Sequence, residues 1–314
     1  MSLACNSPPY SIDLDGNYIL HVPADTPIFR GDEYEWEHPL GVGSYGGVHK
    51  VRNKESNKCF AIKEKRIWPK DEILKRVYQE IKLAGNLIHP NILTILAVES
   101  LPGKVRFLSN LMGMDMDNFH CKDEAILAFV AKQLLEALSY LNQQGIVHRD
   151  LKPSNILLSR DCSLIKICDF ETSVNVSTHV SPLTDAGVLK YSAPELLDTS
   201  LSVKGTYNSD TWSMGLCLLQ FYLNRFPIKF KRNDFASVLS QIVFDGEPPT
   251  APPDCSKEFQ DFISLCLQRQ PNRRASLQKL KEHDFIKLNT TVGRDGKNLD
   301  EKYCSKFCLV GNVG

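Results

Sequence analysis

One short stretch near the middle of the chain gathers the side chains that phosphoryl transfer to a hydroxyl would need. Residues 148–155 read HRDLKPSN, which places a carboxylate, an ammonium group and an amide within six positions. In such a reaction a carboxylate accepts the proton of the incoming hydroxyl, and cations stabilise the charge of the transferring phosphoryl group. We expect Asp150 to be that base, Lys152 to reach the γ-phosphate and Asn155 to bind Mg²⁺. An isolated Asp in a loop is more often a turn or capping residue, so this interpretation depends on the rest of the chain.

A glycine-rich stretch precedes these residues. Residues 40–48 read LGVGSYGGV, with Gly41, Gly43 and Gly46 at the spacing of phosphate-binding loops. The same spacing occurs in dinucleotide-binding units, where a strand leads into a helix. Here two runs of alternating character follow instead, joined by the turn-forming residues 53–57. This pattern predicts a β-hairpin over a nucleotide, whose backbone amides can approach the phosphates closely because glycine has no Cβ.

The second strand of that hairpin carries Ala61 and Lys63 on one face, because side chains alternate along a strand. Ala61 would leave room for adenine, and Lys63 would pair with the α- and β-phosphates. Residues 70–88 have the apolar spacing of a helix. Its predicted apolar stripe is Ile73, Leu74, Val77, Ile81 and Leu83. Glu80 lies beside the stripe and is the candidate partner of Lys63, although exposed carboxylates are common on helices.

Residues 108–119 should link the part of the chain that holds the nucleotide to the part that holds Asp150. Backbone groups of Asn110 and Met112 would hydrogen-bond adenine, and Leu157 would form the floor of the adenine site. A helix is predicted over residues 122–143. The predicted ATP-binding residues are Gly41, Gly43, Gly46, Val48, Ala61, Lys63, Glu80, Asn110, Met112 and Leu157.

With these parts in order, the chain resembles the eukaryotic protein kinases over residues 34–288. Within that family HRDLKPSNILL, TDAGVLKYSAPELL (184–197), SDTWSMGLCLLQ (209–220) and RFPI (225–228) are similar to the MAP kinase kinases. The stretches LMG and FQDFISLCLQRQPNRR resemble the stress-activated branch. A lysine two positions after the catalytic Asp is typical of serine/threonine and dual-specificity kinases.

The resemblance implies an α+β fold of two lobes with MgATP between them. We expect a small, mainly β N-lobe with one helix at residues 34–109, a hinge at 110–113 and a larger, mainly α C-lobe at 114–288. Residues 1–33 are predicted to be a flexible arm, and residues 289–314 a tail with no recognisable pattern.

The resemblance also implies an activity and partners. The enzyme would phosphorylate Thr and Tyr in the activation loop of a MAP kinase of the stress-activated type. An upstream MAP kinase kinase kinase would activate this enzyme by phosphorylating the activation segment of this chain. Thr184 matches the distal phosphosite of the family, whereas the proximal site falls on Val180, so Ser181 or Thr178 would replace it. Phosphate at Thr184 would add a charge of about −1.5 to −2, and Arg149 is the expected docking cation.

One departure from the family concerns the second metal ligand. The family places a metal-binding Asp in the tripeptide Asp-Phe-Gly; Asp169 fits that role, but Glu171 stands in place of the glycine. A left-handed backbone there would cost Glu171 about 1–2 kcal/mol, and its carboxylate would lie near the metal. Two hypotheses follow: an active kinase, or an ATP-binding pseudokinase that serves as a scaffold in a MAP kinase module. A serine/threonine kinase with other substrates is a further alternative.

Two more residues would have structural roles in such a fold. Asp210 would brace the catalytic loop from a buried helix, and Arg274 would pair with Glu195.

The composition excludes several other classes. Lys plus Arg and Asp plus Glu both total 37, so no net charge attracts the protein to nucleic acid or to a membrane. No apolar run reaches the roughly 18 residues of a transmembrane helix, and the first residues lack a signal-peptide pattern. The ten cysteines are scattered without a CxxC pair, which predicts reduced thiols and a cytoplasmic location, with the nucleus as an additional site. Cys304 and Cys308 lack the further ligands of a zinc site. We expect a monomer.

Overall fold

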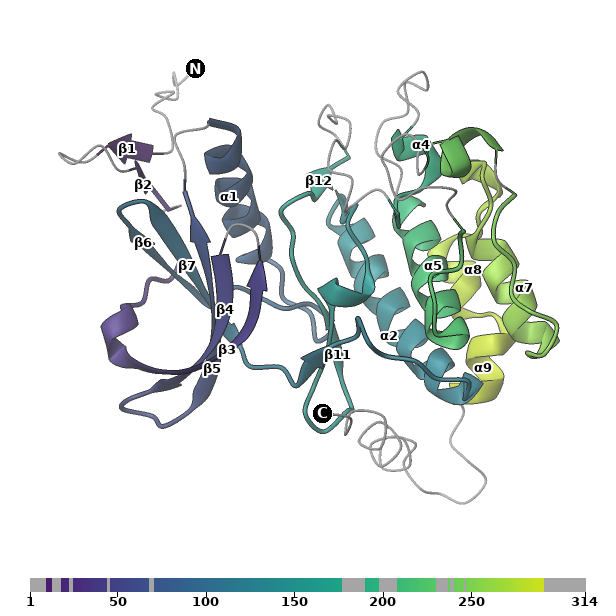
Figure 1. Cartoon of the computed structure of the whole chain (residues 1–314), viewed down its shortest axis with the longest axis horizontal. Helices are drawn as coiled ribbons and strands as arrows, with labels where there is room; N and C mark the ends of the chain where they lie inside the picture. Colours follow the sequence, from purple (N-terminus) through teal and green to yellow (C-terminus); the bar gives the residue numbers. More distant parts are fainter. Residues whose placement is uncertain are drawn as a thin grey trace. The chain divides into compact units, whose positions relative to one another are not determined.

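The computed structural model describes residues 10–12, 18–22, 25–43, 46–67, 71–176, 190–197, 208–229, 237, 240–245 and 247–290. The chain divides into two compact units (Figure 1). Unit 1 comprises Met1–His89 and Leu93–Met112, and unit 2 comprises Pro90–Ile92 and Gly113–Gly314. The boundary at Met112 lies inside the predicted hinge.

Unit 1 is built on an antiparallel sheet of five strands in the order β3-β4-β5-β7-β6 (Figure 1). Its strands are β3 (Tyr34–Gly43), β4 (Gly46–Asn53), β5 (Cys59–Arg66), β6 (Ala97–Leu101) and β7 (Lys104–Asn110). The predicted glycine hairpin is therefore β3-β4, and the predicted strand with Lys63 is β5. Ile92 forms an isolated bridge with Ile167 in unit 2, and the next strand of the sheet, β6, begins at Ala97.

Helix α1 (Asp71–Ala84) packs on this sheet through the apolar stripe predicted from the sequence. Its buried side chains Leu74, Val77 and Ile81 are each at most 1% exposed and share a core with Phe107. Burial of such side chains stabilises the fold by about 1.5–3 kcal/mol each. Leu83 is half-buried, and the side chain of Ile73 lies outside the described residues.

The first part of the chain also joins unit 1. Strands β1 (Tyr10–Ile12) and β2 (Tyr18–Leu20) pair with each other, and a 3-10 turn η1 (Gly31–Glu33) precedes β3. Leu20 is 1% exposed in the core beneath α1, and Phe29 is 7% exposed beside Tyr34. The predicted flexible arm at residues 1–33 is thus wrong for 18–22 and 25–33, because Leu20 and Phe29 are buried in the core and Ile28 forms a bridge with Val98 of β6. The rest of that range, apart from the strand β1, lies outside the described residues.

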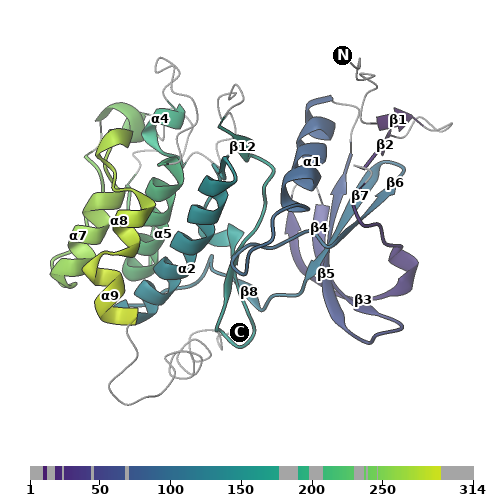
Figure 2. The same ribbon diagram turned by 180° about the vertical axis from the view of Figure 1, so that it is seen from behind.

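Unit 2 is mainly helical, and its longest helix α2 (Glu124–Gln143) packs against α5 (Ser209–Leu223), α8 (Leu277–Lys281) and α9 (Asp284–Thr290) (Figure 2). Helix α2 begins at the N-cap Asp123, whose side chain accepts a hydrogen bond from Ala125 N. The other helical segments of the described part are α4 (Pro194–Leu197), η2 (Pro153–Asn155), η3 (Ser240–Asp245), α7 (Lys257–Cys266) and η4 (Pro271–Arg273).

Short strands hold the two ends of the segment around Asp150. Strand β9 (Ile146–Val147) pairs with β12 (Val174–Asn175). Strand β10 (Ile156–Leu158) lies between β8 (Met114–Asp115) and β11 (Ile165–Ile167). Residues 148–155 therefore run from one paired strand to another, which fixes both ends of the loop.

These two units have the predicted α+β architecture, one mainly β with a single described α-helix and the other mainly α. Among the described helices, none combines the length and the apolar character needed to cross a lipid bilayer.

Candidate active site

Asp150 has one oxygen atom that is held and one that is not. Its Oδ2 accepts a hydrogen bond from Lys152 Nζ at 2.8 Å and another from Asn155 Nδ2 at 3.0 Å. Asn155 Nδ2 also donates to the backbone carbonyl of Asp150 at 2.8 Å. Oδ1 is buried and has no hydrogen-bond partner within the part of the chain that the structure describes. The carboxylate is therefore fixed in orientation, and Oδ1 keeps its capacity to accept a hydrogen bond.

The surroundings of Asp150 strengthen it as a base. Burial raises the pKa of its carboxyl, the positive charge of Lys152 opposes that rise, and the negative charge of Asp169 adds to it. A raised pKa increases the affinity of the carboxylate for a proton. Lys152 therefore favours the ionised form of a carboxyl whose burial favours the neutral form.

Asp210 braces the loop that carries Asp150, as predicted. It lies in the first turn of α5 and is 4% exposed. Its two carboxylate oxygens accept hydrogen bonds from the backbone amides of His148, at 2.8 Å, and Arg149, at 2.9 Å. Burial raises the pKa of Asp210, and these two amides oppose that rise. Arg149 has φ 68°, a left-handed conformation that the two hydrogen bonds help to hold.

The ring of His148 connects this loop to the segment that carries Asp169. The backbone amide of Asp150 donates to His148 Nδ1 at 3.3 Å, so Nε2 carries the proton and donates to the carbonyl of Cys168 at 3.0 Å. The ring also meets Phe170 edge to face, with centroids 4.9 Å apart. Phe170 is 1% exposed, and the tripeptide that contains it is therefore anchored in the core of unit 2.

The backbone cost expected for Glu171 is absent, which corrects the sequence expectation. The non-glycine residues with positive φ in the described part are Asn57, Arg149, Cys162, Asp169 and Asn224. Glu171 is not among them, whereas Asp169 has φ 68°. The turn continues with Ser173 N donating to Phe170 O at 3.1 Å, so the strained position belongs to the predicted metal ligand and not to the unusual glutamate.

Asn155 and Asp169 have the donor atoms that Mg²⁺ prefers. The side-chain nitrogen Nδ2 of Asn155 donates to Asp150, so the side-chain oxygen Oδ1 is the atom left to bind a cation. The backbone carbonyl of Asn155 accepts a hydrogen bond from Cys168 N at 3.0 Å, which ties Asn155 to the residue before Asp169. Amide and carboxylate oxygens are hard ligands suited to Mg²⁺. The residues therefore fit the metal that the sequence predicted.

In unit 1, Lys63 and Glu80 form the predicted ion pair, with Nζ 3.4 Å from Oε1. Glu80 has a nearer partner that was not predicted: Lys65 Nζ lies 2.7 Å from Oε2. Lys65 stands two positions after Lys63 on β5 and therefore shares its face of the sheet. That spacing was the available signal, but a lysine in a strand is more often exposed.

The glycines of the hairpin differ in the space that is available for a side chain. Gly46 has φ 158°, and a Cβ built on it would lie 1.8 Å from Glu64 O, so a side chain cannot be accommodated. A Cβ on Gly41 would meet nothing within 4 Å. Gly43 pairs with Gly46 at the end of the hairpin, and Val48 pairs with both Gly41 and Lys63. Residues 44 and 45 lie outside the described residues.

The predicted adenine-binding residues belong to both units. Ala61 is buried and pairs with Ser109, also buried, on β7. Asn110 is exposed at the end of β7, and Met112 is half-buried two residues later. Leu157 is half-buried on β10 in unit 2. Their contacts with a nucleotide stay predictions.

A second predicted ion pair is structural. Arg274 binds Glu195 through two parallel hydrogen bonds of 2.5 and 2.6 Å, and both side chains are at most 1% exposed. The pair confirms the prediction and ties α4 to the segment after α7. The proposed phosphosites Thr184 and Ser181, with Thr178 and Val180, lie outside the described residues.

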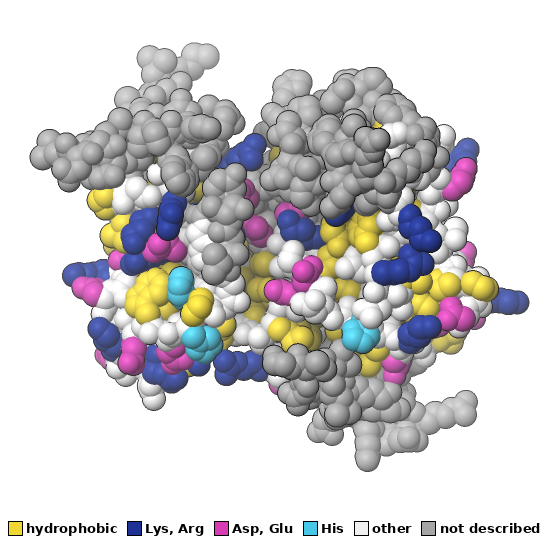
Figure 3. Space-filling view, in the orientation of Figure 1, with side chains coloured by type: hydrophobic (Ala, Val, Ile, Leu, Met, Phe, Trp, Pro, Cys, Tyr) yellow, Lys and Arg dark blue, Asp and Glu magenta, His cyan; other side chains and the backbone are white. Residues whose placement is uncertain are grey.

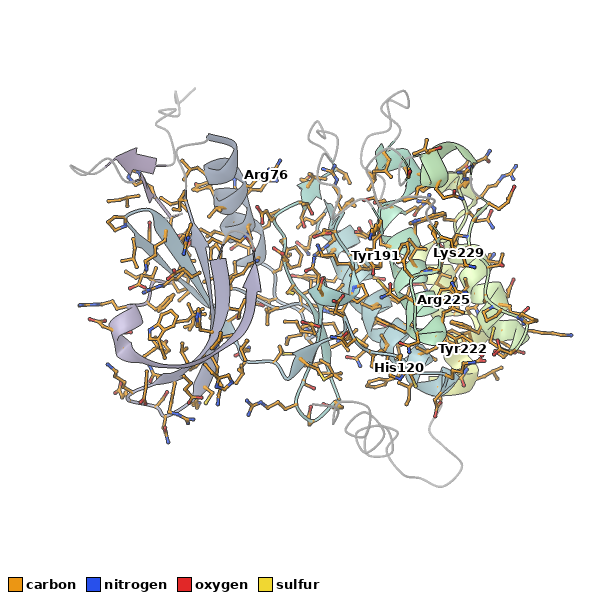
Figure 4. All side chains as sticks on the ribbon, in the orientation of Figure 1. Arg76, His120, Tyr191, Tyr222, Arg225 and Lys229 are labelled. Carbon is orange, nitrogen blue, oxygen red and sulfur yellow. The ribbon has the colours of Figure 1, made fainter. Side chains whose placement is uncertain are left out.

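Basic side chains lie next to exposed hydrophobic side chains on the face of unit 2 that Figure 3 shows. Figure 4 labels His120, Tyr191, Arg225 and Lys229 in this unit, together with Tyr222, which is only 5% exposed. The Tyr191 hydroxyl donates to Gln220 at 2.7 Å, and burial raises the pKa of this phenol.

Comparisons with known proteins agree with this geometry. The family model described as "Protein kinase domain" matches residues 34–286. MAP kinase kinase PBS2 of Saccharomyces cerevisiae is 34% identical over 269 residues, which cover 81% of this chain and 40% of that protein. Mitogen-activated protein kinase kinase 9 of Arabidopsis thaliana is 32% identical over 257 residues, 79% of this chain and 82% of that protein. Protein kinase wis1 of Schizosaccharomyces pombe is 29% identical over 79% of this chain and 42% of its own length. The chain thus spans about two fifths of the yeast relatives that it matches.

Proposed function

The chain belongs to the protein kinase family and, within it, to the MAP kinase kinases, and on that premise we propose that it transfers the γ-phosphoryl group of ATP to Thr and Tyr hydroxyls in a MAP kinase activation loop. The observation that carries this proposal is Asp150, whose Oδ2 is held by Lys152 and Asn155 while Oδ1 is buried without a partner among the described residues.

The residues of the chain would divide the reaction between them. Oδ1 of Asp150 orients the acceptor hydroxyl and takes its proton as the new phosphate ester bond forms and the bond to ADP breaks. Lys152 offsets charge on the transferring phosphoryl group. Lys63 and the glycine hairpin hold the phosphates. Mg²⁺, bound by Asn155 and Asp169, would neutralise charge on the triphosphate.

We further propose a substrate and a regulator. The sequence likeness to the stress-activated branch supports a MAP kinase of that branch as substrate, with a MAP kinase kinase kinase as activator through Thr184 and Ser181. Seven cysteines in the described part of the chain carry reduced thiols, which supports a cytoplasmic protein, with the nucleus as an additional site. We expect it to act as a monomer.

The test is phosphate transfer from MgATP to catalytically inactive MAP kinases of each branch. The enzymes are the wild type, Asp150→Asn and a Thr184→Asp, Ser181→Asp double variant. We expect phosphorylation of a Thr-x-Tyr loop, strongest for the double variant and reduced about a thousandfold by Asp150→Asn because the base is lost. ATP binding should persist in Asp150→Asn.

A matched control is Asp161→Asn, which removes an exposed carboxylate from the same unit and should leave the transfer rate unchanged. ATP binding without transfer by any of the proteins would contradict the proposal and support the scaffold hypothesis instead. Transfer to other protein substrates but to none of the MAP kinases would support a serine/threonine kinase of different specificity.

A further inference from the structure

The chain that precedes β3 lies along the outer edge of the five-stranded sheet in unit 1. Val98 of β6 donates through its amide to the carbonyl of Pro27 at 2.8 Å, and its own carbonyl accepts from Phe29 N at 3.3 Å. Ile28 forms a parallel bridge with the same residue. Because β6 is the outermost strand of the sheet, these contacts pair backbone groups that an edge strand would otherwise expose.

Two more residues of β6 hold the same part of the chain. Ser100 Oγ donates to the carbonyl of Leu20 at 2.7 Å. The carboxylate of Glu99 accepts a hydrogen bond from the amide of Gly31, also at 2.7 Å. Three consecutive residues of β6 therefore fix the described residues of 18–31, which we call the strap.

Leu20 extends from the strap into the core on which α1 packs. It is 1% exposed and shares this core with three buried side chains of the helix, Leu74, Val77 and Ile81. Strand β2, which carries Leu20, lies against β6 and β7 (Figure 2). Protein cores are densely packed, so loss of a buried leucine side chain moves its neighbours or leaves a cavity. The strap therefore helps to set where the buried face of α1 rests on the sheet.

Helix α1 also carries Glu80, the partner of Lys63. Glu80 comes directly before Ile81 and three residues after Val77, so it moves with two of the side chains that pack in this core. Its Oε1 lies 3.4 Å from Lys63 Nζ, and the residue is 3% exposed. One turn of an α-helix is a stiff, hydrogen-bonded unit. A shift of α1 on the sheet therefore shifts the Glu80 carboxylate.

We propose that the strap is a positioning element of the ATP site, in which Leu20 sets the place of α1 and, through Glu80, that of Lys63 at the phosphates. The inference rests on the proposed function, because it assigns Lys63 to ATP. The strap lies before residue 34, where the match to the protein kinase domain begins. The proposal thus gives a part in the reaction to a segment of this chain outside the matched domain.

The first test is Leu20→Ala, which removes the buried side chain of the strap. The KM for ATP should rise about tenfold, because small displacements of groups that position a substrate are costly. The KM for the MAP kinase substrate should not change. Adenosine, which has no phosphate, should bind to the variant and to the wild type equally well. Leu20→Met conserves the volume of the side chain and should keep the KM for ATP within about twofold of the wild-type value.

The second test asks whether Leu20 acts through Glu80. Glu80→Gln removes the charge that pairs with Lys63 and should itself raise the KM for ATP. If the strap acts only by placing that carboxylate, adding Leu20→Ala to Glu80→Gln should raise the KM by less than about twofold further. Independent effects would instead multiply.

Val51→Ala is the matched control for a strap that merely supports the fold. Val51 is fully buried in the core on the opposite face of the sheet, with Tyr34 and Ile62. Loss of folded protein lowers the amount of active enzyme, and with it the apparent kcat, but leaves the KM for ATP unchanged. We expect that result for Val51→Ala and not for Leu20→Ala.

Thermal unfolding of every variant identifies any that fail to fold. If Leu20→Ala is among them, Ser100→Ala carries the comparison, because it removes only the hydrogen bond to the carbonyl of Leu20. Its KM for ATP should rise about two- to threefold, in keeping with the loss of one hydrogen bond. If Glu80→Gln does not fold, the KM values of the single strap variants decide.

The outcomes separate the two proposals. A wild-type KM for ATP in folded Leu20→Ala, or in Ser100→Ala where that variant replaces it, overturns the role of the strap while phosphate transfer by the wild type stands. A full multiplied effect in the double variant also overturns it. Absence of ATP binding or transfer in the wild-type protein overturns the proposed function, and the role of the strap with it.

Discussion

Asp150 in unit 2 and Glu80 in unit 1 are both buried carboxylates with a lysine within hydrogen-bond distance, yet their oxygen atoms are used differently. At Asp150, Lys152 and Asn155 share Oδ2 and leave Oδ1 without a partner among the described residues. At Glu80, each oxygen faces its own lysine. Burial alone would not distinguish the two carboxylates.

The difference lies in which oxygen atoms are occupied. A carboxylate whose two oxygens each face a cation is a weaker proton acceptor and acts as a fixed counter-ion. A carboxylate with one oxygen held and the other without a partner among the described residues is oriented and still able to accept a proton. Glu195, with both oxygens bound by Arg274, belongs with Glu80. The predictions below test this division, from the largest expected effect to the smallest.

Removal of the guanidinium from the most fully paired carboxylate should have the largest effect. In Arg274→Met, Glu195 would keep its charge in the core without the guanidinium that binds both of its oxygens. The free energy of unfolding should fall by about 3–5 kcal/mol, measured by urea denaturation. Arg273→Met, at the exposed neighbouring position, is the control. A loss below about 1 kcal/mol would show that the pair is not structural.

Lys152→Met should remove the ammonium group that pairs with Asp150 and lower kcat about a hundredfold. The rate falls because charge on the transferring phosphoryl group loses a stabilising cation. The pH profile tests the same residue. Burial raises the pKa of Asp150 and Lys152 opposes that rise, so without Lys152 the base ionises only at higher pH. The acidic limb of the kcat profile should therefore move to higher pH.

The control for Lys152 is Lys281→Met. Lys281 makes a contact of the same length, 2.8 Å, with Glu136 on the surface of unit 2. Its loss should leave both kcat and the acidic limb in place. A Lys152→Met profile that moves to lower pH would contradict the role assigned to the lysine.

Gly46 and Gly41 of the glycine hairpin allow a matched test of the residues predicted to hold the phosphates. Gly46→Ala would drive a Cβ into Glu64 O and displace the strand that pairs with Lys63. The KM for ATP should rise about tenfold, because small displacements of positioning groups are costly. Gly41→Ala, where a Cβ meets nothing, should have a smaller effect. Equal effects would indicate that backbone flexibility, and not space, is the important property.

Glu171→Gly should have the smallest effect. Glu171 does not have a positive φ, so glycine relieves no strain there, and kcat should change by less than about threefold. Glu171→Gln separates the charge from the backbone in the same assay. A tenfold loss of kcat in either variant would show that Glu171 takes part in the reaction.

Pairs carried by recognisable motifs could be predicted from the sequence. The pairs Lys63–Glu80 and Glu195–Arg274 and the bracing of the loop by Asp210 are all present. They were predictable because the motifs fix the element and the direction of each side chain. The phosphosites Thr184 and Ser181 stay predictions.

The remaining features depend on packing that local patterns do not encode. Lys65 has the composition of an exposed strand residue, and only the fit of α1 against the sheet buries it beside Glu80. Leu20 and Phe29 lie in short apolar runs, YIL (18–20) and PIF (27–29), which are too brief to show which side chain is buried. Which oxygen of Asp150 Lys152 and Asn155 bind is set by side-chain geometry, which no sequence pattern specifies.

The backbone of Cys168 links the segment that carries Asp169 to the loop that carries Asp150, and so affects how the two segments move. Its amide donates to Asn155 O and its carbonyl accepts from His148 Nε2, both at 3.0 Å. Separation of Asp169 from the loop of Asp150 must break both hydrogen bonds, each contributing about 1 kcal/mol. The two segments should therefore open as one cooperative unit. In hydrogen–deuterium exchange, the amide of Cys168 would exchange with solvent at the same rate as those of His148 and Arg149.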